Sequence, residues 1–549
     1  MKPENIESIY ELSPTQQGLL FHSLFAPDSG MYAGQFNLTF PDLNAQAFER
    51  AWQRIMERHT TFRSSFFWEE MDKPLQVVSR KVPLPLEQQD WRSLRPDEQA
   101  TRTQFFLAQD RTRGFDLAEA PLMRFTLIRI GESAYQFTWS QHHLLLDGWS
   151  VALVLKEIFK LYEAFNKGLD LQLPPTRPYR DYIVWLQQQD SAGAEEFWRR
   201  TLHGITAPTP LVIERPISHL SEEAGLYGDS SVYGDQRVTL NSEVSDGLRQ
   251  LARQHKLTLN TLMQGAWALV LSRYSGETDV IFGAVVSGRP PELSGVEEMV
   301  GLFINTLPVR VKIDESAILA SWLQQLQAEQ VEMRGYEFSA LAEVQRWSDV
   351  PAGTPLFQTI LAFENYPVDS SLRRDNEGPQ VSTATLTEKA NYPLVVVVIP
   401  KSEIIIKMNY ENSRLEKETV TLMLGHLQTM LEAMIADPYQ HLSALPLLTE
   451  KERKQILIEW NDTRTDYPSQ QCIHQVFESQ VRRAPESIAV IFGEESVSYA
   501  QLNTRANQLA HYLQRSGVGP EVSVGVVLER SVDMVVALLG TLKAGGWLP

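Results

Sequence analysis

Residues 141–150, with the sequence QHHLLLDGWS, bring together side chains whose types could carry out chemistry. Two adjacent histidines, His142 and His143, are followed by Asp147 and Gly148. Histidine can take up or release a proton near neutral pH because its ordinary pKa is about 6.5. An aspartate can hold a cation or a backbone amide in place, and a glycine lets another group approach the backbone closely. The spacing predicts a site for proton transfer or for positioning a reacting group; the alternative is a pair of histidines that serve only the core.

The elements on both sides of this stretch are predicted from their periodicity. Residues 135–140 alternate as a β-strand does, and residues 122–130 are expected to form a hairpin with them. Apolar residues recur on one helical face from 151 to 165, so a helix is expected there, with Ser150 as its N-cap. Adjacent side chains at the end of a strand point to opposite sides of the backbone, so only one histidine should face the reaction.

The stretch resembles the HHxxxDG signature of the condensation domains of nonribosomal peptide synthetases. The wider superfamily of chloramphenicol-acetyltransferase-like acyltransferases shares this signature. Six other segments resemble further condensation-domain motifs in the family order: 12–24 (LSPTQQGLLFHSL), 58–66 (RHTTFRSSF), 179–185 (YRDYIVW), 300–310 (VGLFINTLPVR), 336–341 (YEFSAL) and 354–358 (TPLFQ).

The resemblance implies an α/β fold of two chloramphenicol-acetyltransferase-like lobes, arranged as a V-shaped pseudo-dimer. The lobes are expected at 1–175 and 176–445, with a linker at 446–470. Residues 471–549 resemble the opening of an adenylation domain, because 496–503 (SVSYAQLN) and 542–549 (LKAGGWLP) match its first two motifs. No Gly/Ser/Thr-rich phosphate loop follows in the sequence. This partial α/β subdomain is therefore expected to be incomplete and not to catalyse ATP chemistry.

The implied reaction is peptide-bond formation. The amine of an acceptor aminoacyl thioester attacks the carbonyl of a donor thioester, and both substrates hang on phosphopantetheine arms of separate donor and acceptor peptidyl carrier proteins. The chain itself is expected to bind no cofactor and no metal. By the family pattern His143 is catalytic, either handling a proton or holding the amine, and His142 packs behind it. Gly148 is expected to offer a backbone N–H to the oxyanion.

Supporting residues follow from the same motifs. A buried guanidinium needs a carboxylate partner, so Asp147 is expected to pair with Arg58 or Arg63 and to hold the loop. Trp149, Ser287 and Asn305 are expected to line a substrate tunnel between the lobes.

Neighbouring subfamilies can be compared residue by residue. Heterocyclisation domains carry aspartates where this chain has paired histidines, and epimerisation domains tend to have tryptophan after the serine, where Val151 stands here. The first motif, with Gln-Gly after the glutamine, leans toward a donor that ends in a D-residue. Two rival functions stay open, a free-standing acyltransferase acting on a soluble amine and a catalytically silent carrier-docking domain. The adenylation-like tail argues against the first, and the intact His143 argues against the second.

Composition narrows the functional classes further. The 549 residues carry a formal net charge of −18, which disfavours nucleic acids and anionic membranes as partners. The single cysteine, Cys472, excludes an internal disulfide and fits a reducing cytoplasm. The first residues lack an apolar signal core, and runs such as 394–399 are far too short to span a membrane. We therefore expect a cytoplasmic monomer whose partners are carrier proteins and the rest of its synthetase module.

Overall fold

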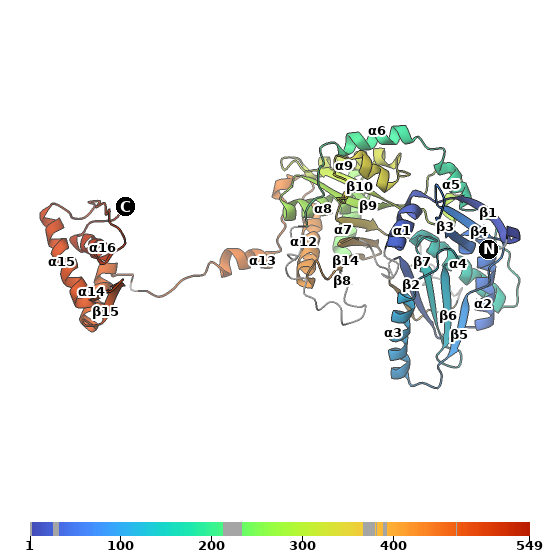
Figure 1. The fold of residues 1–549 in the computed structure, drawn as a ribbon, viewed down its shortest axis with the longest axis horizontal. Helices are drawn as coiled ribbons and strands as arrows, with labels where there is room; N and C mark the ends of the chain where they lie inside the picture. Colours follow the sequence, from blue (N-terminus) through green and yellow to red (C-terminus); the bar gives the residue numbers. More distant parts are fainter. Residues whose placement is uncertain are drawn as a thin grey trace. The chain divides into compact units, whose positions relative to one another are not determined.

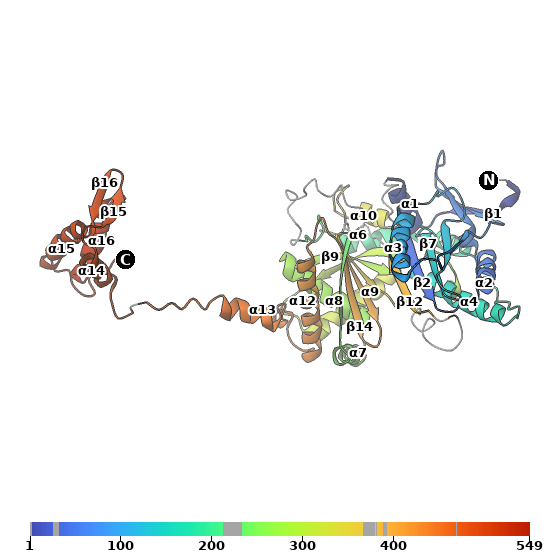
Figure 2. The same cartoon turned by 90° about the horizontal axis from the view of Figure 1, so that it is seen from below.

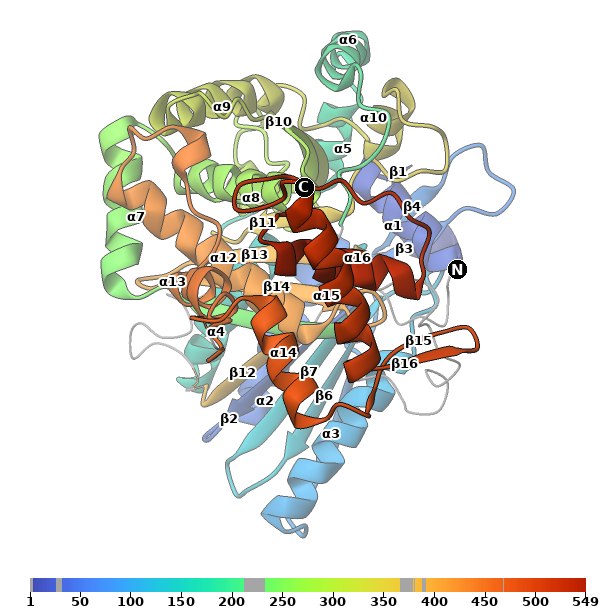
Figure 3. The ribbon, with the colours of Figure 1, turned by 90° about the vertical axis from the view of Figure 1, so that its left-hand side faces the viewer.

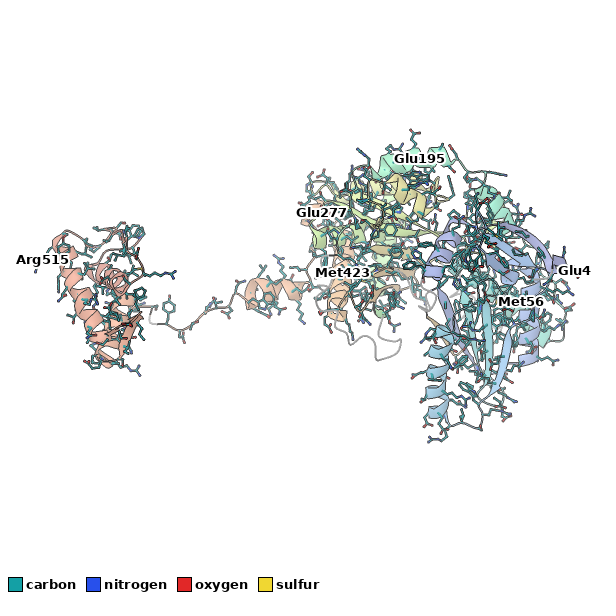
Figure 4. All side chains as sticks on the ribbon, in the orientation of Figure 1. Glu4, Met56, Glu195, Glu277, Met423 and Arg515 are labelled. Carbon is teal, nitrogen blue, oxygen red and sulfur yellow. The ribbon has the colours of Figure 1, made fainter. Side chains whose placement is uncertain are left out.

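The computed structural model describes residues 3–25, 32–211, 233–365, 379, 381–387, 392–467 and 469–549. Contacts divide the chain into two compact units, Met1–Arg453 and Lys454–Pro549. The first unit contains two large hydrophobic cores, to which Met56 and Met423, labelled in Figure 4, respectively belong. Each core lies under its own β-sheet, and these two layered assemblies are called the first and second lobes below.

The first lobe is built on a five-stranded sheet with the strand order β12-β2-β7-β6-β5. Helices α2 (Ala45–Arg58) and α4 (Gly148–Asn166) cover one face, and α3 (Pro96–Thr112) lies along the other (Figure 1). Four of the strands come from the first 150 residues: β2 (Ala33–Phe40), β5 (Leu86–Asp90), β6 (Met123–Arg129) and β7 (Tyr135–His142). The predicted hairpin is confirmed, since β6 and β7 pair antiparallel.

Aromatic side chains fill the core between this sheet and α2. The Trp52 ring centroid lies 4.2 Å from that of Phe125, and the Phe48 centroid 4.9 Å from that of Phe137. Trp52, Phe125 and Phe137 are at most 1% exposed. Truncating such a residue to alanine typically costs ~3–5 kcal/mol, so this core holds β7 firmly in place. Asn44 caps α2 as its sequence predicts, accepting a hydrogen bond from Ala47 N at 3.2 Å.

A smaller sheet and one helix adjoin the first lobe. The sheet has the order β1-β4-β3, from β1 (Ile6–Glu11), β4 (Leu75–Ser79) and β3 (Ser64–Phe67). Helix α1 (Pro14–Phe25) follows β1 and buries Gln16 and Leu20. Figure 1 shows α1 where the two lobes meet.

The second lobe has a six-stranded sheet in the order β10-β9-β11-β13-β14-β8. Its strands are β8 (Tyr233–Thr239), β9 (Asp279–Val286), β10 (Asn305–Lys312), β11 (Thr359–Phe363), β13 (Leu394–Pro400) and β14 (Ile404–Glu411). The helices around it are α7 (Ser242–His255), α8 (Leu259–Ser275), α9 (Leu319–Arg334) and α12 (Lys417–Ala436), with the shorter α5 (Arg180–Leu186), α6 (Ser191–Leu202) and α10 (Leu341–Trp347) nearby (Figure 2). The predicted hairpin of β13 and β14 is confirmed by their antiparallel register.

One strand crosses between the lobes. β12 (Thr383–Thr387) stands between strands of the second lobe in sequence, yet it pairs antiparallel with β2 of the first lobe. Val300 likewise belongs to the core of the first lobe. The first sheet is therefore completed by a segment from the 176–445 half, because a free edge of β2 can be paired by any strand that reaches it.

The second unit is small and has its own core. Helices α14 (Ile473–Arg483), α15 (Tyr499–Arg515) and α16 (Val532–Ala544) pack with the hairpin of β15 (Ile488–Phe492) and β16 (Glu495–Ser498) (Figure 3). Its core contains the buried side chains Val497, Leu502, Val532 and Val536. Ahead of it come α13 (Glu450–Lys454) and a turn of π-helix at Gln455–Glu459. Both units mix helices with sheets, so the α/β class is confirmed. Among the described helices of the whole chain, none combines the length and apolarity that a membrane crossing requires.

Candidate active site

Strand β7 carries the chain to the histidine pair. It extends to His142, two residues beyond the predicted strand, and pairs His142 with Ala33 of β2. Phe137 and Trp139 point into the aromatic core and are fully buried. The histidines therefore emerge from the most rigid part of the first lobe.

Helix α4 begins at Gly148, and its N-cap is Asp147. The prediction that Ser150 caps this helix is wrong, because Ser150 N donates to Asp147 Oδ1 at 2.7 Å. A carboxylate three residues ahead accepts a free backbone N–H of the first turn and also interacts favourably with the helix dipole. The Ser150 hydroxyl instead donates to the carbonyl oxygen of Gly301 at 2.7 Å.

Asp147 joins the two lobes. Its side chain is fully buried, and its Oδ2 accepts a hydrogen bond from Phe303 N at 2.9 Å. Its own backbone N donates to Gly301 O at 3.2 Å. The loop that holds the histidines is thus attached directly to residues 301–303 of the second lobe.

The cation beside Asp147 is Arg289, so the predicted pairing of Asp147 with Arg58 or Arg63 is wrong. Arg289 Nη2 lies 3.4 Å from Asp147 Oδ1, and its guanidinium carbon lies 4.0 Å from the centroid of the Phe303 ring. Burial lowers the pKa of Arg289 below its ordinary value, while Asp147 acts in the opposite direction. The sequence does carry one signal for Arg289: an arginine that directly follows an apolar strand, in the segment 287–291 (SGRPP).

Arg58 and Arg63 have other partners. Arg58 is the last residue of α2 and pairs with Glu157 of α4 at 3.1 Å. Arg63 pairs with Glu7 of β1, and its Nε donates to Met56 O at 3.1 Å. Both arginines support the first lobe, at positions that the packing of α2 on α4 and of the small sheet determines.

The two histidines differ in burial. His142 is 5% exposed, and its Nδ1 accepts a hydrogen bond from Leu144 N at 3.2 Å. Burial, together with the neighbouring His143, lowers the pKa of His142 to about 3. His142 is therefore a neutral packing residue near pH 7. His143 is partly exposed, and its backbone N donates to Tyr32 O at 2.8 Å.

Gly148 is partly exposed and is the first residue of α4. The first backbone N–H groups of a helix have no partner within the helix and carry partial positive charge. The start of α4 can therefore stabilise negative charge that develops close to it.

The three residues predicted to line a tunnel lie on three different elements. Trp149 is partly exposed, and its Nε1 donates to Glu297 O at 3.0 Å. Ser287 is exposed just after β9. Asn305 is buried, and its Nδ2 donates to the carbonyl oxygens of Glu337 and Ser339 at 2.9 and 2.7 Å. The amide of Asn305 therefore holds a loop of the second lobe.

The family model described as "Condensation domain" matches residues 6–457, which include both lobes and the histidine loop. This chain belongs to the condensation-domain family. The model described as "AMP-binding enzyme" matches residues 477–548, within the second unit. The resemblance that the motifs indicated, a condensation domain followed by the beginning of an adenylation domain, is confirmed.

Curated relatives are synthetases of antibiotic peptides. One of the proteins that make up the linear gramicidin synthase of Brevibacillus parabrevis is 45% identical over 541 residues, which cover 98% of this condensation-domain chain and 10% of that protein. Bacitracin synthase 3 of Bacillus licheniformis is 36% identical over 555 residues, or 100% of this chain and 8% of that protein. The chain spans a tenth or less of these two relatives.

Solved structures share the fold. A four-domain nonribosomal peptide synthetase, AB3403, bound to AMP and glycine, superposes with a TM-score of 0.76 at 20% identity, over 99% of this chain and 41% of that one. The first condensation domain of the calcium-dependent antibiotic synthetase gives a TM-score of 0.64 at 16% identity, over 81% of this chain and 100% of that one.

Proposed function

We propose that this condensation domain forms a peptide bond between two carrier-bound substrates, with His143 at the reacting centre. The acceptor amine attacks the carbonyl carbon of the donor thioester, a C–N bond forms, and the C–S bond breaks. The donor arm leaves as a thiol, and the proton lost by the amine accounts for the proton that the sulfur gains. The observation that carries the proposal is the contrast within the histidine pair, in which His142 is buried and neutral and His143 is partly exposed.

A protein nucleophile is not required, because a thioester is already activated toward an amine. The only cysteine of the sequence, Cys472, lies in the second unit, away from the histidine loop in sequence and fold. The domain then needs to position the two substrates and to manage one proton. His143 meets the second need by accepting the amine proton or by holding the amine in line, and the backbone N–H of Gly148 at the start of α4 stabilises the oxyanion.

The partners in this proposal are a donor and an acceptor peptidyl carrier protein. Each supplies its own phosphopantetheine arm, so the chain contributes residues and no cofactor. The AMP-binding fragment after the condensation unit and the synthetases among the relatives support an assembly-line setting. A reducing cytoplasm suits the reaction, because the thiols of both arms must stay unoxidised.

His143→Ala and His142→Ala test the proposal together. Each protein is mixed with one loaded donor carrier and one loaded acceptor carrier, and single-turnover product is measured by intact-protein mass spectrometry. His143→Ala should react roughly 10²–10⁴-fold more slowly and melt close to the unaltered protein, because it removes a partly exposed group that handles the proton. His142→Ala should lose stability first, because it leaves a cavity and an unpaired backbone amide in a buried site.

A soluble amine replaces the acceptor carrier in a parallel reaction. Product that forms equally well with the soluble amine would instead indicate a free-standing type of acyltransferase. Carrier binding without any product would indicate a docking domain. A folded His143→Ala protein with a near-normal rate would contradict the role assigned to His143 and leave substrate positioning as the main source of rate.

A further inference from the structure

Helix α1 contacts the histidine pair through Ser23. Its Oγ lies 3.2 Å from Nε2 of His142, and the same hydroxyl donates to the carbonyl oxygen of Leu19 at 2.7 Å. On the opposite side of the ring, Leu144 N donates to Nδ1 of His142. A backbone N–H can only donate, so Nδ1 must present a lone pair.

These contacts determine where the ring proton lies. Because burial lowers the pKa of His142 to about 3, the ring is neutral near pH 7 and holds one proton. Since Nδ1 is the acceptor, that proton is on Nε2 and is donated to Ser23. The hydroxyl proton of Ser23 then goes to Leu19, so the chain of donors runs in one direction from the ring to α1.

We propose that Ser23 is a positioning residue of the active site, whose hydroxyl fixes the orientation and tautomer of His142 and thereby the turn that presents His143. The His142 ring holds the amide of Leu144, the residue that follows His143. In the other tautomer, a proton on Nδ1 would face the Leu144 N–H, and two donors cannot bond to each other. The turn around His143 would then lose one of its supports.

A second contact from α1 reaches the same residue. Gln16 Nε2 donates to the carbonyl oxygen of Leu144 at 3.0 Å, and Gln16 is completely buried. Leu144 is thus held at its carbonyl by Gln16 and at its amide by His142, which Ser23 orients. Helix α1 therefore supports the residue after His143 through both of its backbone groups.

The test compares Ser23→Ala with Ser23→Thr, which keeps a hydroxyl. Thr429→Ala is the matched control, because Thr429 donates to Gly425 O within α12 in the same way that Ser23 donates within α1. Ring nitrogens are observed by ¹⁵N NMR on histidine-labelled protein, with the His142 signals assigned by comparison with His142→Asn. Peptide formation is measured on the same samples in single-turnover reactions with two loaded carriers, and melting is recorded for each.

We expect His142 to show the Nε2–H tautomer in the unaltered protein and a mixture of tautomers in Ser23→Ala. The rate should fall about tenfold in Ser23→Ala, the factor that one lost hydrogen bond at a buried group is typically worth. Ser23→Thr should retain the tautomer and most of the rate, and Thr429→Ala should change neither.

A Ser23→Ala protein with an unchanged tautomer would overturn the inference, whatever its rate, and so would a shifted tautomer with an unchanged rate. The inference about rate rests on the proposed function, and the NMR result does not. If the unaltered protein forms no peptide although the tautomer shifts in Ser23→Ala, the proposed function fails and the contact of Ser23 with His142 is supported.

Discussion

Replacing Asp147 with alanine removes the acceptor of three donors where the two lobes meet. The backbone N–H groups of Ser150 and Phe303 would each lose a partner in a buried site, which costs ~1–3 kcal/mol apiece. The contact with Arg289, at 3.4 Å, is the longest of the three and adds less. Together we expect the free energy of unfolding of the first unit to fall by ~3–5 kcal/mol, the usual result of removing one member of a buried charged pair.

A double-mutant cycle identifies the true partner of Asp147. Arg289→Met should destabilise less than Asp147→Ala, because the carboxylate keeps both amide donors. The two changes together should differ from their sum by ~0.5–3 kcal/mol, since the side chains are in contact. Arg58→Met is the matched control: Arg58 pairs with Glu157, so its coupling to Asp147 should stay within ~0.5 kcal/mol.

Urea unfolding followed by tryptophan fluorescence gives these energies from linear extrapolation. The transition of the first unit should be analysed separately from that of the second, because two units need not unfold together. Coupling of Asp147 to Arg58 that exceeds its coupling to Arg289 would refute the reasoning. A stable Asp147→Ala protein that no longer forms peptide would place Asp147 in the chemistry itself.

Three further predictions concern other parts of the chain. Burial raises the pKa of Glu337 to about 7, against the opposing effects of Arg334 and the Gly288 N–H, so the folded state binds this proton more tightly than the unfolded chain. The resulting stabilisation is complete below the unfolded pKa and is lost as pH rises through about 7; melting curves from pH 5 to 8 should therefore decline less for Glu337→Gln, and parallel curves would contradict the assignment. Residues 471–549 should not support amino-acid-dependent exchange of pyrophosphate into ATP, because no phosphate loop is present in the sequence, and measurable exchange would disprove this. The first motif leads us to expect faster reaction with a donor ending in a D-residue than with its L-counterpart on the same carrier, and a clear L preference would reverse that expectation.

Local periodicity predicted the elements that carry the site. The alternation of residues 135–140 and the apolar face of 151–165 correspond to β7 and α4, and the hairpins of β6 with β7 and of β13 with β14 were expected from short separations. The helix start was misplaced by three residues because Ser150 and Asp147 are both good caps. Only the hydrogen bond from Ser150 N to Asp147 shows which of them acts as the cap.

The resemblance to condensation domains also depends on the sequence alone, because the order of residue types in a chain is read directly from it. The same holds for the difference expected between the two histidines, which follows from the alternation of side chains at the end of a strand. The matching family models confirm the first of these inferences.

Tertiary structure alone decided which distant residues meet. Arg58, Arg63 and Arg289 are equally capable of pairing with Asp147 as far as their chemistry goes, and only the packing of the lobes brings Arg289 to it. The pairing of β12 with β2, across more than 340 residues, and the contact of Ser23 with His142, across 119, are likewise absent from any local pattern. Short-range order follows from backbone geometry and side-chain periodicity within a few residues. A long-range contact depends on how whole sheets and helices bury their apolar faces against one another, and that is a property of the folded chain.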